Sequence, residues 1–128
     1  MRHEAKNRHH RSTPLEVLEL FRTWDPEVSL KAACAFLYVA ENEGLSISEL
    51  AYLLRTSAST ATRVVAQLAS PSPEEPEPLL EVRPWPGDGR VRTVHLGARG
   101  RELLEQVNSS IREAQPIQAH PTTTYLAA

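Results

Sequence analysis

The sequence predicts a small, mostly helical α+β domain that contains a helix-turn-helix and a two-stranded hairpin. Three observations indicate this fold class. Apolar residues recur at helical spacing through most of the chain, two of the helical stretches are joined by a tight turn within residues 46–68, and residues 79–96 change to an alternating pattern around a proline-glycine turn. At 128 residues the chain is long enough for one domain with a modest core and two tails.

Two helices are expected before the helix-turn-helix. Thr13-Pro14 is a typical helix entry, with Thr13 as the cap, and the first helix must stop at Asp25-Pro26 because proline cannot continue it. Ser29 caps the next helix, which the turn residues 42–44 end. The apolar stripe predicted for the first helix consists of Leu15, Leu18, Phe21 and Trp24.

The helix-turn-helix is predicted for residues 46–68. Ser46 and Glu49 fit a capping box, in which each side chain binds the other residue's backbone amide at the helix start. Ser57 caps the second helix. Short hydroxyl side chains and an arginine on the polar face of that helix suit close approach to phosphates and base edges, although a merely solvated face remains an alternative. This face consists of Ser59, Thr60, Thr62, Arg63 and Gln67.

A two-stranded hairpin is expected in residues 79–96. Residues 86–89, Pro-Gly-Asp-Gly, are strong turn formers between two stretches of alternating apolar residues. Arg90 and Arg92 lie beside Asp88 at the tip. A hairpin with arginines at its tip, one loop after a helix-turn-helix, indicates a winged helix-turn-helix with a two-stranded β wing. The alternative is an ordinary surface hairpin whose arginines keep it soluble.

The remaining segments set the domain limits. Residues 1–13 are predicted to be a disordered basic arm and residues 115–128 a flexible tail, so the winged-helix domain spans residues 14–114. The connection at residues 69–78 contains four prolines and three glutamates and is expected to be an exposed loop. A last helix is predicted at about residues 98–114, and its apolar stripe consists of Leu103, Leu104, Val107 and Ile111.

The charge is distributed unevenly along the chain, although the net charge is only -2 at pH 7. Residues 55–101 carry seven arginines, and outside the acidic connection and its exit only Asp88 opposes them. A positive stripe confined to the second helix of the motif and the hairpin is the electrostatic footprint of a DNA-facing edge. The glutamates of the connection and its exit are Glu74, Glu75, Glu77 and Glu81.

Other classes of protein lack support in the sequence. There is no apolar stretch long enough to span a membrane and no secretory signal, and the single Cys34 suits a reducing cytoplasm, so a cytoplasmic location is expected. No glycine-rich nucleotide loop, paired-histidine zinc motif or cysteine-histidine signature is present. We therefore predict no enzymatic activity, no cofactor and no metal site.

Four short motifs in order carry a resemblance to a known family. They are Leu50-Ala51, the segment from Ser57 to Arg63, the pair Asp88-x-Arg90, and Leu96-x-x-x-Gly100-Arg101. Over roughly residues 30–112, the chain resembles the MarR family of bacterial regulators. The resemblance has three departures: Gly97 stands where the family has a capping threonine, the acidic connection is longer, and the final helix is shorter.

The resemblance implies specific roles for residues of this chain. Members of the family are homodimers, here through the first and last helices, that place the second helix of the motif in the major groove of DNA. Arg90 would then probe the minor groove, with Asp88 orienting its guanidinium. The groove or phosphate contacts implied for the second helix are Ser57, Ser59, Thr60, Thr62 and Arg63.

The function predicted on this basis is sequence-specific binding of double-stranded DNA to regulate transcription, as a repressor that occludes a promoter. The alternative is a winged-helix protein-interaction or replication-accessory module that does not read DNA sequence, which the negative net charge favours. The resemblance also implies that a small-molecule effector could bind this protein. Trp24 and Tyr38 are candidates to line its pocket, with a plain core role as the alternative.

Overall fold

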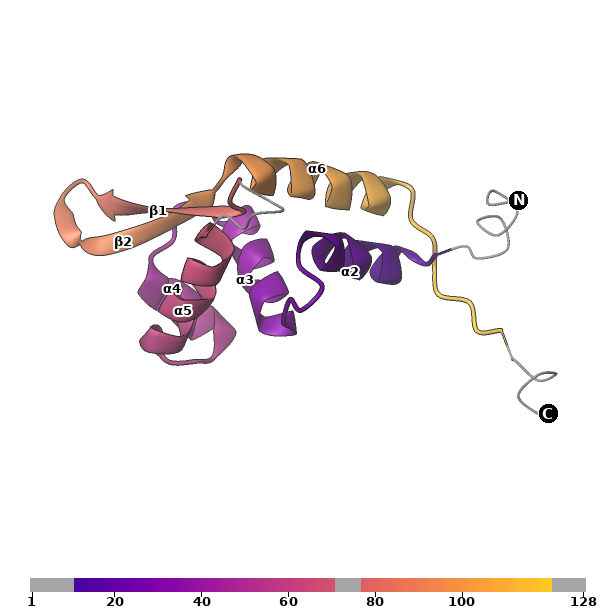
Figure 1. Ribbon diagram of the computed structural model, residues 1–128, viewed down its shortest axis with the longest axis horizontal. Helices are drawn as coiled ribbons and strands as arrows, with labels where there is room; N and C mark the ends of the chain where they lie inside the picture. Colours follow the sequence, from indigo (N-terminus) through magenta and orange to yellow (C-terminus); the bar gives the residue numbers. More distant parts are fainter. Residues whose placement is uncertain (1–10, 71–76, 121–128) are drawn as a thin grey trace.

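The computed structural model describes residues 11–70 and 77–120 (Figure 1). These residues form five helices and one antiparallel two-stranded sheet, the predicted mostly helical α+β winged helix. The elements are α2 (Thr13–Trp24), α3 (Leu30–Glu41), α4 (Ile47–Leu54), α5 (Ala58–Ala69), β1 (Leu80–Trp85), β2 (Asp88–Leu96) and α6 (Ala98–Arg112). In the part of the chain that is described, no helix is both long and apolar enough to cross a membrane.

The three serine caps that the sequence predicts, at Ser29, Ser46 and Ser57, are all present. The Ser29 hydroxyl accepts the Ala32 amide at 3.0 Å at the start of α3. At α4 the capping box is complete: the Ser46 hydroxyl accepts the Glu49 amide at 3.1 Å, and the Glu49 carboxylate accepts the Ser46 amide at 2.8 Å. These two hydrogen bonds fix the start of the helix-turn-helix at Ser46.

The predicted cap of the first helix is wrong by one residue. Thr13 is the first residue of α2, and the extended residue Ser12 caps the helix by accepting the Leu15 amide at 3.4 Å. The Thr13 hydroxyl has a different partner, because it accepts the Gln115 amide at 2.6 Å, while the Thr13 amide donates to the Gln115 carbonyl at 2.7 Å. The two ends of the helical domain are thus hydrogen-bonded to each other.

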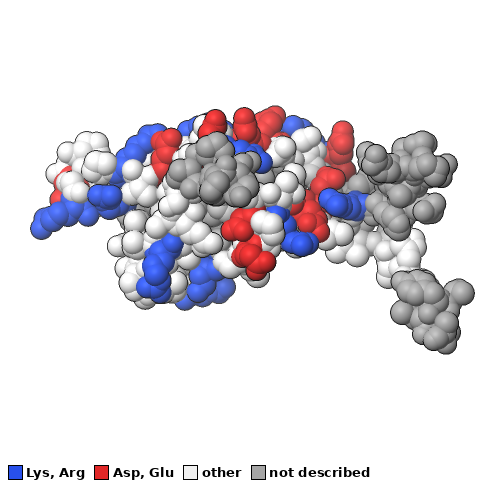
Figure 2. All heavy atoms as spheres, in the orientation of Figure 1, with Lys and Arg blue, Asp and Glu red and all other residues white. Residues whose placement is uncertain are grey.

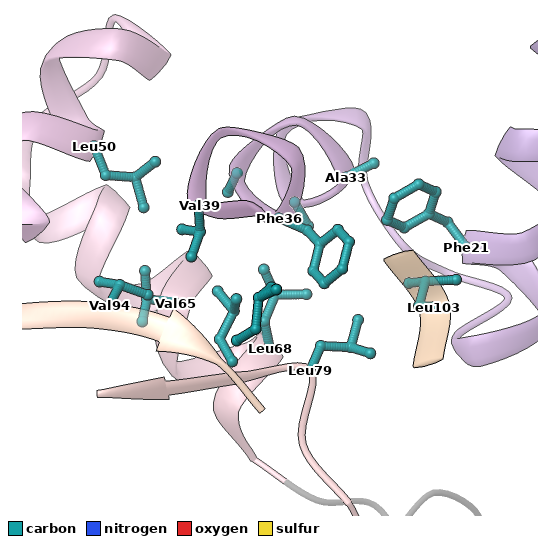
Figure 3. Close-up of a cluster of buried hydrophobic side chains, with 14 of the residues drawn as sticks. Phe21, Ala33, Phe36, Val39, Leu50, Val65, Leu68, Leu79, Val94 and Leu103 are labelled. Atoms are coloured by element: carbon teal, nitrogen blue, oxygen red, sulfur yellow. The ribbon is translucent and has the colours of Figure 1, made fainter. Parts of the chain in front are cut away.

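The core surrounds α3, which lies between the helix-turn-helix and the α2–α6 pair (Figures 1 and 3). Phe36 on α3 meets Phe21 on α2 edge to face, with ring centroids 5.6 Å apart and an interplanar angle of 76°. On the other side, α3 packs against α4 and α5. Side chains from every element meet in this one cluster; those labelled in Figure 3 are Phe21, Ala33, Phe36, Val39, Leu50, Val65, Leu68, Leu79, Val94 and Leu103.

The predicted apolar stripes of α2 and α6 are buried only in part. Leu15 and Leu18 are each 47% exposed and Ile111 is 54% exposed, whereas Phe21, Leu103 and Val107 are buried. The buried position near the end of α6 is Ser110, whose hydroxyl donates to the Glu16 carboxylate at 2.6 Å. A polar contact therefore joins α2 to α6.

A close backbone crossing explains why glycine occurs at the start of α6. The Leu79 amide donates to the Leu68 carbonyl at 3.0 Å, and the Gly97 amide donates to the Leu79 carbonyl at 2.8 Å. A Cβ at Gly97 would lie 2.5 Å from the Pro78 carbonyl oxygen. The capping threonine of the MarR family is therefore sterically excluded here, and α6 starts at Ala98 without a side-chain cap.

Three predicted segments lie wholly or largely outside the described residues. Residues 1–10 comprise most of the basic arm, residues 71–76 comprise most of the acidic connection, and residues 121–128 end the tail. Of the tail, residues 115–120 are described. They are exposed and belong to no helix or strand. The domain limits predicted from the sequence remain predictions.

Candidate nucleic-acid interface

The start of α5 brings three predicted site hydroxyls together. Ser57 caps the helix by accepting the Thr60 amide at 3.1 Å. Its hydroxyl also lies 3.0 Å from the Thr60 hydroxyl and 3.2 Å from the Ser59 hydroxyl. The remaining free amides of the first turn point out of the same end of the helix, where a negatively charged group is favoured. The amides at this end of α5 can therefore donate hydrogen bonds to a phosphate oxygen.

Arg63 lies one turn further along α5 and is exposed. Its Nη2 atom donates to the Thr60 hydroxyl at 3.2 Å, so the guanidinium is directed toward the helix start. Thr62 is exposed as well, but its hydroxyl donates to the Ala58 carbonyl at 2.8 Å. Thr62 therefore presents its methyl group and the lone pairs of its oxygen to a partner, not a free hydroxyl donor.

The wing tip holds Arg90 in one orientation. The Asp88 carboxylate accepts hydrogen bonds from Arg90 Nε at 3.2 Å, from Arg90 Nη2 at 3.3 Å and from the Arg90 amide at 3.0 Å. These bonds, chiefly those of the guanidinium, hold the pKa of the Asp88 carboxyl below its ordinary value of 3.8. Arg90 remains 92% exposed, so its orientation is set while its charge faces outward.

The register of the wing places Arg90 outside the regular ladder. Pro84 faces Arg92, whereas Trp85 faces Asp88, so the three residues between Asp88 and Arg92 have no opposite residue in β1. Such an irregularity bends a strand and redirects its side chains. Arg92, also a predicted site residue, is exposed and has no ion-pair partner among the described residues.

Two further arginines were not among the predicted site residues. Arg55 ends α4 in the left-handed backbone region, with φ 56° and ψ 49°, and its side chain is exposed in the turn of the helix-turn-helix. This conformation disfavours any residue with a Cβ atom. Arg83, on β1, pairs with Glu81 at 3.0 Å. In the sequence, the alternating pattern of β1 and the turn before Ser57 are the signals that could have placed these two arginines at the surface. Both arginines add to the basic surface of the helix-turn-helix and the wing.

The base of the wing is attached to the turn between α3 and α4. The Gly44 amide donates to the Val94 carbonyl at 2.8 Å, and the Val94 amide donates to the Leu45 carbonyl at 2.9 Å. An isolated antiparallel bridge pairs Ser46 with Thr93. Because α4 begins directly after this bridge, the orientation of the wing relative to the helix-turn-helix is set by backbone hydrogen bonds.

Glu43 connects the end of β2 to α6. Its carboxylate accepts the Leu96 amide at 3.0 Å and Arg101 Nη2 at 2.8 Å. Partial burial by itself raises the pKa of the Glu43 carboxyl, but these two donors outweigh it, so the pKa lies below its ordinary value of 4.5. The ionised carboxylate therefore stabilises the fold.

We expect Glu43→Gln to lower the free energy of unfolding by about 1 kcal/mol at neutral pH, because an amide loses the charge-assisted bond to a partly exposed Arg101. A carboxyl whose pKa is lowered in the folded state stabilises the fold at pH values above its unfolded-state pKa. This contribution is lost as the pH falls through its folded-state pKa. The stabilities of the two proteins should therefore converge below pH 4.5, as measured by urea unfolding across a pH series. A constant difference at all pH values would contradict the ionic role of Glu43.

The basic elements share one end of the molecule. In Figure 1, the wing and the α4–α5 pair both lie at the left, and α5 contacts β1. Figure 2 shows basic side chains projecting from the wing and from the α4–α5 region, while acidic side chains gather over α6 and toward α2. The hydroxyl face of α5 and the arginines of the wing are thus available to a single elongated, negatively charged partner.

Comparison with known proteins identifies the fold. No protein-family model and no curated protein sequence match the chain. Solved structures do match: the transcriptional regulator Tm0710 of Thermotoga maritima is 20% identical with a TM-score of 0.65, covering 79% of this chain and 66% of its own. A MarR-like transcriptional regulator of the same organism, Tm0816, is 28% identical with a TM-score of 0.56, covering 68% of this chain and 57% of its own.

A third similar structure contains nucleic acid. It is a mutant MepR of S. aureus bound to an oligodeoxyribonucleotide, 17% identical to this chain with a TM-score of 0.60, covering 79% of this chain and 69% of its own. The chain therefore has the winged helix-turn-helix fold of MarR-type transcriptional regulators, which confirms the predicted resemblance at the level of the fold. It covers between 57% and 69% of the length of these proteins.

Proposed function

We propose that this protein regulates transcription by binding double-stranded DNA sequence-specifically. The observation that carries the proposal is that helix α5 and the wing lie at the same end of the molecule (Figure 1). The polar face of α5 carries the hydroxyls, and the tip of the wing carries Arg90 bound to Asp88. The matching fold of transcriptional regulators, one of them bound to an oligodeoxyribonucleotide, supports it. The proposal requires no catalytic chemistry, cofactor or metal.

The mechanism follows from the positions of these groups. Helix α5 enters the major groove, where Arg63 contacts a base edge and the hydroxyls of Ser57, Ser59 and Thr60 contact the phosphate backbone. Arg90 enters the adjacent minor groove, and Arg92 neutralises a phosphate. Each arginine that replaces a condensed counterion releases it, so the affinity falls as the salt concentration rises. Occupancy of a promoter by the protein represses transcription.

A homodimer through α2 and α6 completes the proposal. Leu15 and Leu18 on α2 and Ile111 near the end of α6 are about half exposed. Helix α2 and the end of α6 lie away from the wing (Figure 1), so these side chains can supply apolar surface for a second copy. Twofold symmetry would place two α5 helices on half-sites about one helical turn apart. The cytoplasm is the matching location. Trp24 and Tyr38 pack against the core, which favours a structural role for them over an effector pocket.

Arg90→Ala is expected to weaken binding to a duplex recovered from a random pool and to reduce the slope of log K against log salt by about one. The reason is the loss of one charge at the DNA, and the measurement is fluorescence anisotropy of the labelled duplex in a salt series. Arg22→Ala, which removes an exposed α2 arginine paired with Glu19, is the matched control and should leave the slope unchanged.

Two outcomes would contradict the proposal at different levels. An unchanged slope for Arg90→Ala would remove Arg90 from the interface but leave DNA binding intact. Absence of salt-sensitive binding by the wild-type protein would overturn the regulator proposal and support the alternative of a protein-interaction module.

A further inference from the structure

An exposed tryptophan lies at the tip of the wing. Trp85 is 51% exposed, although tryptophan is usually well buried in a folded domain. It ends β1, is flanked by prolines on both sides, and faces Asp88 across the hairpin. Val91, in the unpaired part of β2, is 38% exposed. The tip therefore presents apolar surface that the fold does not use.

One edge of the indole lies against the turn of the hairpin. A Cβ built on Gly87 would lie 3.0 Å from Trp85 Nε1 and 3.4 Å from Cδ1, so the nitrogen-bearing edge of the ring rests against the glycine of the turn. The φ of Gly87 is not in the left-handed region, so a Cβ there would strain no backbone but would require the indole to shift by a few tenths of an ångström. The ring is thereby positioned, while about half of its surface faces solvent.

The surroundings of this apolar tip are basic. The residue that faces Trp85 is Asp88, which binds Arg90, and the exposed side chains of Arg90 and Arg92 follow directly in β2. Figure 2 shows basic side chains along the wing. A second copy of this chain or another protein would have to supply acidic groups around an apolar pocket. A DNA minor groove supplies phosphates along both edges and apolar deoxyribose walls between them, within a width of about 6 Å.

We propose that Trp85 is a DNA-contacting residue, whose indole packs against the deoxyribose wall of the minor groove beside Arg90. This inference rests on the proposed function and adds an apolar, charge-independent component to a wing otherwise assigned to arginine. Aromatic and apolar side chains at minor-groove contacts add affinity without displacing counterions. The contributions of Trp85 and Arg90 are therefore separable by salt.

The first test compares Trp85→Ala with Arg90→Ala by anisotropy of a labelled duplex recovered from a random pool. Trp85→Ala should lower the affinity about tenfold at every salt concentration and leave the slope of log K against log salt unchanged. Arg90→Ala should reduce that slope. Leu30→Ala, which truncates another exposed apolar side chain on α3, is the matched control and should bind as the wild type does.

The second test uses the tryptophan as its own reporter. The chain has two tryptophans, so Trp24→Phe leaves Trp85 as the single tryptophan, which is excited selectively at wavelengths that the three tyrosines do not absorb. Addition of the duplex should quench and shift its emission at the same concentrations that raise the anisotropy. Gly87→Ala, which displaces the indole without altering a charge, should reduce both the quenching and the affinity.

The outcomes separate the two proposals. If the wild type binds the duplex but Trp85→Ala binds equally well, or if the Trp85 emission does not change on binding, the inference is overturned and the regulator proposal stands. If Trp85 emission changes with protein concentration in the absence of DNA, the tip contacts protein and the inference is also overturned. If the wild type binds no duplex, both proposals fail.

Discussion

Gly100→Ala is expected to lower the free energy of unfolding by about 3 kcal/mol, the upper range for overpacking a core. A Cβ at this position would lie inside van der Waals contact with the Leu79 carbonyl oxygen and 3.1 Å from Phe36 Cε1. The Leu79 carbonyl cannot move freely, because it accepts the Gly97 amide at 2.8 Å. This loss should exceed the gain in helix propensity of about 1 kcal/mol. Urea unfolding measures the net change.

Gly89→Ala is the matched control for this prediction. A Cβ at Gly89 would meet no atom within 4 Å, so the substitution should change the urea midpoint little. Equal effects of the two substitutions would mean that the crossing of Leu79 over α6 does not restrict position 100.

Arg63→Ala is expected to have the largest effect on sequence preference. A base-edge contact by an arginine contributes about 1–3 kcal/mol of discrimination against the wrong base. A loss of at least 1.4 kcal/mol corresponds to binding of the selected duplex that is weaker by roughly tenfold or more. Binding to a random duplex should weaken much less. Competition between the two duplexes measures the ratio directly.

Arg112→Ala provides the control for Arg63→Ala. Arg112 is exposed in the last turn of α6, at the end of the molecule away from the wing, so its loss removes the same charge without a groove contact. Its affinities for both duplexes should stay unchanged. Equal losses on the two duplexes for Arg63→Ala would reduce Arg63 to a phosphate contact.

Local signals in the sequence predicted the elements well. The capping box at Ser46, the serine caps and the proline-glycine turn act through hydrogen bonds between near neighbours, and each one is present in the structure. The start of α2 was misplaced because Thr13 bonds to Gln115, a contact between opposite ends of the chain. No local pattern reports such a contact.

The candidate site was predicted only in part, because some of its contacts join neighbours in the sequence and others join distant residues. The pairing of Asp88 with Arg90 spans two residues and could be inferred from sequence. The contribution of Glu43 could not, because its partners Leu96 and Arg101 lie more than fifty residues away. Leu15 and Leu18 fit a helical stripe, but periodicity alone does not tell which side of a helix meets the core. The groove contacts of Ser57, Ser59, Thr60, Thr62, Arg63, Arg90 and Arg92 remain predictions.

The carboxylate of Glu43 fastens the turn after α3 to the junction of β2 and α6. It binds the last residue of β2 and the first turn of α6 at once, so the direction of α6 is tied to that of the strand that carries Arg90. In a symmetric pair joined through α6, the separation of the two wing tips would then depend on the angle between the paired helices. A change in that angle would alter which spacing of half-sites the pair can span.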